Sequence, residues 1–156
     1  MSKPQTTRTT WAPLRCMPVF VRDRFTDRYS GTPLVFPGAL RLLSLLMPTE
    51  FPFHPNWRQS ETHPAYWELS PTIDHVVPLA RGGTDDESNV VTTSMLRNAA
   101  KSNWTLQELG WSVLPVPAES GWDGLLPWFM EAYEQFEVAR EHLGTREWHR
   151  VAKSAA

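Results

Sequence analysis

The first clear pattern along the chain is an apolar run that lies between Pro37 and Pro48. Leu40, Leu43 and Leu46 recur at a spacing that places them on one face of a helix. A proline is tolerated in the first turn of a helix, and a proline after the last turn ends it. The run therefore predicts a helix that begins at Pro37 and stops before Pro48.

A second apolar stripe predicts a longer helix near the C-terminus, over about residues 125–143. Leu126, Phe129, Tyr133 and Phe136 recur at helical spacing, and the glutamates at positions 131, 134 and 137 fall on the opposite face. Gly144 follows the stripe, as glycine commonly does at the C-terminal end of a helix.

The middle of the chain, residues 72–103, follows the order strand, loop, strand, helix. The β-branched runs TIDHVV and NVVTT predict two strands, and LARGGTDDES between them has the chemistry of a turn, so we expect an antiparallel hairpin. SMLRNAAKSN then predicts a helix with Thr93 or Ser94 as its N-cap. TLQE predicts a capping box for a short further helix, and WSVLPVP predicts another strand.

These elements predict one α+β domain of 156 residues. We expect residues 1–15 to form a flexible polar arm and residues 16–156 a single domain. Residues 19–21 fit either a short strand or a helical turn. Fourteen prolines and eight tryptophans indicate ordered, irregular connections held by aromatic side chains, above all between residues 48 and 67.

The cysteine content and the N-terminal sequence limit the cellular compartments in which we expect the protein. Cys16 is the single cysteine, which excludes an internal disulfide and any zinc site that needs two thiolates. MSKPQTTRTT lacks the apolar segment of a signal peptide, and GALRLLSLLM is too short to span a bilayer. We therefore expect a cytoplasmic protein that does not bind a membrane.

The net charge of −2 hides an asymmetry between the two parts of the chain. Residues 1–60 carry eight Lys or Arg against three Asp or Glu, whereas residues 61–156 carry seven against fourteen. The basic part is either a surface that holds phosphates or an ordinary solvated surface of mixed charge. The candidates for phosphate contact in it are Arg15, Arg22, Arg24 and Arg28.

Polar residues in the hairpin and helix form a candidate active site. Asp74 and His75 lie on the first predicted strand, and Asn98 and Lys101 share one face of the following helix. A helix that packs across the hairpin brings Asn98 close to Asp74. A carboxylate and an amide oxygen are ligands that Mg²⁺ accepts, and a histidine can take a proton from water near neutral pH.

The stretch DHVVPLARGGTDDESNVVTTSMLRNAAKSN resembles the His-Asn-His (HNH) endonuclease motif, which is a ββα-metal finger. The positions that match the motif, in order, are Asp74, His75, Pro78, Gly82, Gly83, Asn89, Asn98 and Lys101. The last motif position is Asn, so the chain is similar to the His-Asn-Asn version of the family. The resemblance covers residues 72–103 and implies a hairpin plus helix with additional helices at both ends.

The resemblance also implies a metal-dependent DNA endonuclease or nickase. His75 would be the general base. Asn89 would tie the loop to the strand and orient His75. Asp74 and Asn98 would hold one divalent cation, Mg²⁺ or Mn²⁺, and Lys101 would contact phosphate or Asn98. RNA as the substrate, the number of strands cut and the oligomeric state remain open.

Many members of the family flank this motif with two cysteine pairs that bind a structural zinc, and this chain lacks them. Asp27 and Ser30 stand at the first pair of positions, and Ser94 and Arg97 stand at the second. We therefore expect no structural zinc. We predict instead an ion pair between Asp27 and Arg97, helped by the two serines.

Other polar residues have simpler interpretations. His54 and His63 each precede a proline and are interpreted as structural, Glu68 is equally a partner of the site or a surface charge, and the acidic run at residues 85–87 is interpreted as a solvated loop. Two alternatives to a nuclease stay open. One is a DNA-binding module of the same fold that cleaves little or not at all, and the other is an interaction protein that uses its acidic C-terminal helix.

Overall fold

The structure is a computed structural model that describes residues 10–155. Over that range the chain belongs to the α+β class, with eight α-helices and one antiparallel two-stranded sheet. The elements are α1 (Pro13–Arg22), α2 (Pro37–Leu46), α3 (Ala65–Leu69), β1 (Pro71–His75), β2 (Val90–Ser94), α4 (Met95–Lys101), α5 (Leu106–Leu109), α6 (Leu126–Gln135), α7 (Glu137–Glu141) and α8 (Leu143–Ser154), with short 3₁₀ turns at Gln59–Glu61, Leu79–Arg81 and Glu87–Asn89.

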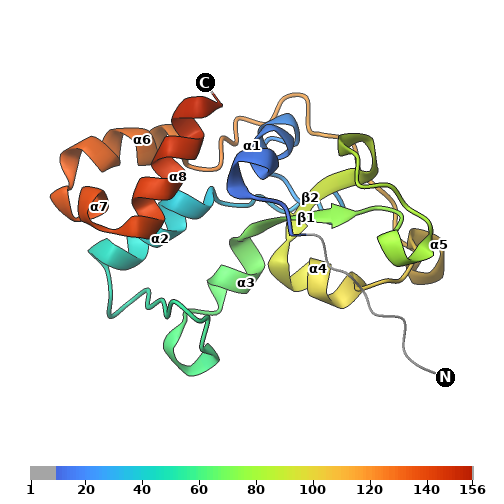
Figure 1. The fold of residues 1–156 in the computed structure, drawn as a ribbon, viewed down its shortest axis with the longest axis horizontal. Coiled ribbons are helices and arrows are strands. Elements are labelled where there is room, and N and C mark those ends of the chain that lie inside the picture. Colours follow the sequence, from blue (N-terminus) through green and yellow to red (C-terminus); the bar gives the residue numbers. More distant parts are fainter. Residues whose placement is uncertain (1–9, 156) are drawn as a thin grey trace.

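The elements gather at two ends of the molecule, with α1 between them (Figure 1). Helices α2, α6, α7 and α8 pack together at one end, and the hairpin lies with α4 and α5 at the other. Helix α1 packs against α8 and also against both strands. No helix within residues 10–155 combines the length and the apolar character needed to cross a membrane.

The predicted hairpin forms, and its turn explains the paired glycines. Asp74 lies opposite Val91 in the antiparallel register. Gly82 has a φ of +89°, which favours glycine, and a Cβ on Gly83 would lie 1.8 Å from the carbonyl oxygen of Val77. Only a residue without a side chain fits at that second position, so the loop can fold back tightly onto the end of β1.

Two helix starts follow the predicted chemistry. The Ser94 hydroxyl accepts a hydrogen bond from the backbone N–H of Arg97, which makes Ser94 the N-cap of α4. Thr105 and Glu108 form the capping box of α5. Because α4 starts directly at the end of β2, its position on the hairpin is set by this cap.

The helix predicted over about residues 125–143 is instead two helices, α6 and α7, with a third, α8, beginning at Leu143, and this is a correction. Phe136, between α6 and α7, has an extended backbone with φ −106° and ψ 111°. The Arg140 guanidinium donates to the carbonyl oxygens of Tyr133 and Glu134, which satisfies the open end of α6. The apolar spacing continues across the break, so the periodic pattern did not reveal it.

Gly144 does not end a helix, and this is a second correction at the same place. The residue lies inside α8, which continues to Ser154. A Cβ at Gly144 would lie 3.0 Å from the guanidinium of Arg41 on α2. The glycine therefore permits close packing of α8 against α2.

Two further expectations change near the N-terminus and after α5. Residues 1–9 of the predicted arm lie outside the described residues, but Trp11 is buried and α1 begins at Pro13, so residues 10–15 belong to the domain. Residues 19–21, which fit either a short strand or a helical turn, belong to α1. The stretch WSVLPVP at residues 111–117 forms no strand.

Aromatic side chains form the core, as the many tryptophans and phenylalanines indicate. Phe36 is fully buried and its ring lies 5.1 Å from that of Phe129. Tyr66 is 1% exposed and collects the rings of the proline-rich segment before it, at 4.7 Å from Phe53 and 5.4 Å from Trp57. The irregular segment over residues 48–67 is thus held in place by aromatic packing.

Candidate active site

Asp74 presents a carboxylate that is held on one side and open on the other. Its side chain is nearly buried, and Oδ2 accepts a hydrogen bond of 2.6 Å from the Tyr29 hydroxyl and lies 3.0 Å from Nζ of Lys101. Burial raises the pKa of this carboxyl, whereas the Tyr29 hydroxyl and the Lys101 ammonium lower it. Oδ1 has no hydrogen-bond partner within residues 10–155.

Asn98 on α4 is oriented so that its carbonyl oxygen is also open. Its Nδ2 donates to Oγ1 of Thr72 at 3.0 Å and to the carbonyl oxygen of Ile73 at 3.1 Å. Both donors of the amide are therefore used on β1, next to Asp74, and Oδ1 accepts no hydrogen bond from a described residue. The helix thus brings the amide to the strand, as the sequence predicted.

These two oxygens fit a divalent cation of the hard type. No group of three or more His, Cys, Asp or Glu side chains that could hold a metal occurs within residues 10–155, so the donor set available here is one carboxylate and one amide. Mg²⁺ is commonly held by one or two protein oxygens, with water and substrate phosphate completing its shell. The chemistry of the donor set therefore suits Mg²⁺ better than a metal that needs a full protein cage.

His75 faces the loop and α1, away from Asp74. Its Nε2 lies 2.7 Å from Oδ1 of Asp85, and its ring packs edge-on against Trp11 at a centroid distance of 6.4 Å. A carboxylate only accepts hydrogen bonds, so Nε2 carries the proton and the lone pair lies on Nδ1. The His75 side chain is 14% exposed, and Nδ1 is the ring atom that can accept a proton.

Asp85 contacts His75 and is a candidate that the sequence interpretation missed, since the acidic run was interpreted as a solvated loop. Its carboxylate accepts hydrogen bonds from Nε1 of Trp11 at 2.8 Å and from Arg15 at 3.1 Å. The bonds from Trp11, His75 and Arg15 lower the pKa of Asp85 to about 2. No local pattern could reveal this role, because the fold alone brings the start of α1 to this loop.

Asn89 ties the loop to the strand, in the position expected of it. Its side chain accepts from the N–H of Val77 at 3.0 Å and donates to the carbonyl oxygens of Val77 at 2.9 Å and Thr84 at 2.8 Å. It makes no side-chain bond to His75. The predicted role of Asn89 in orienting His75 stays a prediction.

The expectation for Lys101 needs correction. The side chain is 0% exposed, and its ammonium donates to the carbonyl oxygen of His75 at 2.9 Å while it pairs with Asp74. A fully buried ammonium with these partners balances the charge of a buried carboxylate. In this arrangement Lys101 cannot reach a phosphate.

Asp27 links two segments that lie far apart in the sequence, the turn that follows it and the end of β2. Its Oδ1 accepts from the backbone N–H of Tyr29 and Ser30, and its Oδ2 accepts from the hydroxyl of Thr93 at 2.9 Å and the N–H of Ser94 at 3.0 Å. The predicted ion pair with Arg97 is present at 3.6 Å.

Both serines help this link, through their backbone N–H groups rather than through their hydroxyls. The Ser30 hydroxyl binds Thr32, and the Ser94 hydroxyl caps α4. The link between the segments is therefore made by one buried carboxylate, with a longer contact to Arg97.

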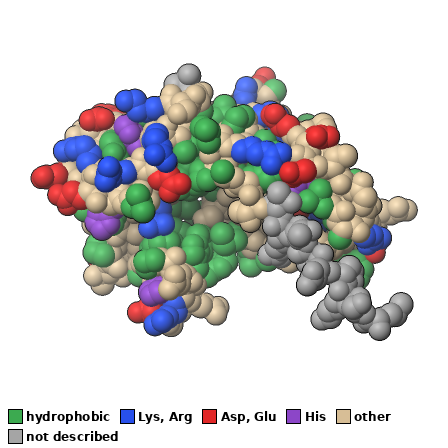
Figure 2. Space-filling model, in the orientation of Figure 1, with side chains coloured by type: hydrophobic (Ala, Val, Ile, Leu, Met, Phe, Trp, Pro, Cys, Tyr) green, Lys and Arg blue, Asp and Glu red, His purple; other side chains and the backbone are tan. Residues whose placement is uncertain are grey.

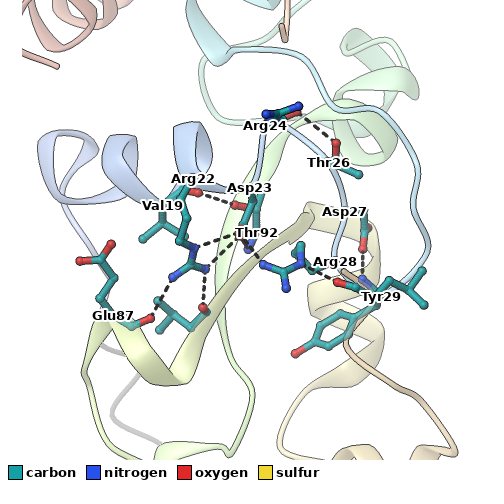
Figure 3. A network of polar contacts seen from close by, with 12 residues as sticks. Val19, Arg22, Asp23, Arg24, Thr26, Asp27, Arg28, Tyr29, Glu87 and Thr92 are labelled. Atoms are coloured by element: carbon teal, nitrogen blue, oxygen red, sulfur yellow. Dashed lines mark hydrogen bonds and ion pairs between the residues drawn. The ribbon is translucent and has the colours of Figure 1, made fainter. Parts of the chain in front are cut away.

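The basic residues predicted to hold phosphate are engaged inside the molecule (Figure 3). Arg22 and Arg28 both bind the buried carboxylate of Asp23, at 2.9 Å and 2.6 Å, and Arg22 also donates to the carbonyl oxygen of Val90. Arg24 donates to backbone carbonyls near residue 118. Together with Arg15 at Asp85, these guanidinium groups stabilise the fold rather than standing free for phosphate, which corrects the expectation.

The remaining candidates lie away from the hairpin. Nδ1 of His54 and Nδ1 of His63 each accept a backbone N–H two residues on, so both histidines shape the irregular segment over residues 48–67. Glu68 forms no hydrogen bond or ion pair with another described residue. Trp57 is packed in the core, and Trp104 is 53% exposed.

Comparison with known proteins adds no relative. No protein-family model matches the chain, and no curated protein or solved structure matches it either. What is established is the α+β class and the geometry of the hairpin, its loop and α4. The resemblance to the HNH family depends on the order of the motif residues and on that geometry.

Proposed function

We propose that the protein is a metal-dependent endonuclease of the HNH type that hydrolyses phosphodiester bonds in DNA. The observation that carries this proposal is the set of three open atoms at one end of the hairpin: Nδ1 of His75, Oδ1 of Asp74 and Oδ1 of Asn98. A histidine base and a pair of hard oxygen ligands are sufficient equipment for this hydrolysis.

Each residue takes one role in the proposed reaction. Nδ1 of His75 removes a proton from water, and the resulting hydroxide attacks phosphorus while the bond to the 3′-oxygen breaks and that oxygen takes a proton from solvent. Asp85 holds Nε2 of His75 and stabilises the imidazolium that forms. Asp74 and Asn98 would hold the divalent cation, which when bound stabilises charge on the phosphate and the leaving oxygen. The products carry 5′-phosphate and 3′-hydroxyl ends.

The opposite orientation of His75 and Asp74 suits this reaction. Neighbouring residues of a strand point to opposite faces, and these two residues have different neighbours, Asp85 for one and Tyr29 for the other. An in-line displacement needs its base and its leaving-group stabiliser on opposite sides of the phosphorus atom. A phosphate at the end of β1 would lie between them.

A DNA-binding module without activity is the second candidate, and a specific contact favours it. The Lys101 ammonium lies 3.0 Å from Asp74, where its positive charge opposes a second cation at the same carboxylate. Binding of a divalent cation by the wild-type protein would therefore favour the nuclease, and failure to bind one would favour the inactive module.

Metal-dependent nicking of supercoiled plasmid tests the proposal. We expect Mg²⁺ or Mn²⁺ to support cleavage and EDTA to stop it. Asn98→Ala removes one ligand and should raise the metal concentration needed for half-maximal cleavage by about 10- to 100-fold. Asn103→Ala, which changes an exposed amide just beyond α4, should behave as wild type. DNA binding without cleavage at any metal concentration would support the inactive module.

The role of Asp85 is tested by the split between rate and affinity. Asp85→Ala should lower kcat by about 10- to 100-fold, because His75 loses the group that sets its tautomer, and should leave KM for DNA nearly unchanged. Asp85→Asn keeps an acceptor for Nε2 and should recover part of the rate. Asp86→Ala, at an exposed neighbouring carboxylate, serves as the control. An unchanged kcat in Asp85→Ala would remove Asp85 from the mechanism.

A further inference from the structure

Three exposed cations on α8 have no partner in the molecule. Arg146, Arg150 and Lys153 are exposed, and none of their side chains forms a hydrogen bond or ion pair with another described residue. The other basic side chains of residues 10–155 are occupied. Hydrogen bonds or ion pairs hold Arg15, Arg22, Arg24, Arg28, Arg58, Arg81, Arg97, Lys101 and Arg140. Arg41 packs its guanidinium over the ring of Phe53.

The three side chains share one stripe of the helix. Residues four and then three apart project from the same face of an α-helix, and this stripe is about 10 Å long. All three line one open hollow between α6 and α8, together with Tyr133 and Glu147. Figure 2 shows Lys and Arg side chains gathered over this end of the molecule, with Asp and Glu side chains among them toward its edge.

The charge of the hollow is positive at neutral pH. Three cations face one lining carboxylate, that of Glu147. His149 also lines the hollow, stacked on Tyr133 at 3.7 Å, but burial and the charge of Lys153 lower its pKa, while Glu134 opposes the shift. His149 is therefore not counted among the cations.

A phosphate backbone fits this hollow better than a lipid surface does. The apolar face of α8 is buried, since Val151 and Ala152 belong to the core, so no broad apolar face remains to enter a membrane. Leu143, at 76% exposure, is the one large apolar side chain on the outer side of the helix. Guanidinium groups match phosphate oxygens in pairs, and cations in a row can follow successive phosphates of a strand.

We propose that the α8 stripe, defined as Arg146, Arg150 and Lys153, binds the phosphate backbone of DNA that flanks the cleavage site. The proposal rests on the proposed nuclease function. Helix α8 and the hairpin lie at different ends of the molecule and α1 packs on both, so the stripe contacts the duplex away from the scissile bond (Figure 1). It supplies affinity without taking part in the chemistry.

A matched pair of triple variants tests the α8 stripe. Arg146→Gln/Arg150→Gln/Lys153→Gln removes the stripe and keeps good helix formers. Arg24→Gln/Arg58→Gln/Arg81→Gln removes the same charge at exposed arginines that have internal partners. Binding of each protein to a labelled DNA duplex is measured by fluorescence anisotropy in EDTA over a series of NaCl concentrations, and plasmid nicking is measured with Mg²⁺.

The stripe variant should bind more weakly, and the slope of log affinity against log salt should become shallower by about 2 to 3, as expected for three lost phosphate contacts. Its nicking rate at saturating DNA should equal that of wild type. The control variant should keep the wild-type slope. Circular dichroism confirms that both variants fold.

Other outcomes overturn the inference, and they identify which idea fails. If the slope of log affinity against log salt is equal in all three proteins and plasmid nicking is retained, the α8 stripe does not bind DNA. The proposed nuclease function would stand. A wild-type protein that neither binds nor nicks DNA would remove the proposed function and the stripe with it. If the stripe variant instead loses binding to vesicles that contain phosphatidylserine, with DNA binding unchanged, the hollow is a membrane contact.

Discussion

Replacing His75 with alanine should lower the rate of plasmid cleavage by about 100- to 10,000-fold, the range typical of a lost general base. Nδ1 of this imidazole has no hydrogen-bond partner among residues 10–155, and histidine is the side chain that most often serves as a general base. Asp74 and Asn98 stay in place in this variant, so Mn²⁺ binding should be unchanged. The rate of nicking and the Mn²⁺ affinity are measured on the same preparation.

The control for this variant is His142→Ala, which removes an exposed imidazole at the start of α8. It should cleave as wild type does. Cleavage by His75→Ala at the wild-type rate would contradict the assignment of the base. Loss of cleavage together with loss of Mn²⁺ binding would instead show that the substitution disturbs the metal site.

Replacing Asp27 with alanine should destabilise the fold by about 3 to 5 kcal/mol, the cost typical of breaking a buried charged network. The Asp27 carboxylate is 1% exposed, and four donors lose their acceptor together: the N–H groups of Tyr29, Ser30 and Ser94 and the hydroxyl of Thr93. Urea unfolding at fixed pH measures the change in the free energy of unfolding.

Asp86→Ala is the matched control for stability as well, since its exposed side chain has no partner among the described residues, and it should change the free energy of unfolding by less than about 0.5 kcal/mol. Asp27→Asn keeps one acceptor oxygen and should fall between the two. If Asp27→Ala lowers the free energy of unfolding as little as Asp86→Ala does, Asp27 is not the residue that holds the two segments together.

The hairpin and α4 could be predicted from the sequence because their causes are local. β-branched runs favour strands, Gly83 is required where a side chain would strike the Val77 carbonyl, and Ser94 caps the helix that follows. The Asn98 amide reaches Thr72 and Ile73 on β1 for the same reason, since α4 starts where β2 ends and Asn98 lies four residues after the N-cap, Ser94.

The rest of the site depends on contacts between distant segments. Asp85 accepts a hydrogen bond from Trp11, which lies 74 positions earlier in the chain, and no spacing pattern in the sequence predicts that contact. The basic N-terminal part predicted a free surface, yet Asp23 is a buried carboxylate that binds Arg22 and Arg28. Counting charges along a chain cannot distinguish a solvated cation from one whose partner is buried beside it.

The brace at Asp27 also bears on how the chain reaches its fold. In domains braced by zinc, the folded state forms only when metal is bound, so the supply of the ion limits folding. Here a single carboxylate joins a turn to a strand 66 residues away, and every donor it needs is part of the same chain. The link between this turn and β2 can therefore form as soon as the two segments fold together.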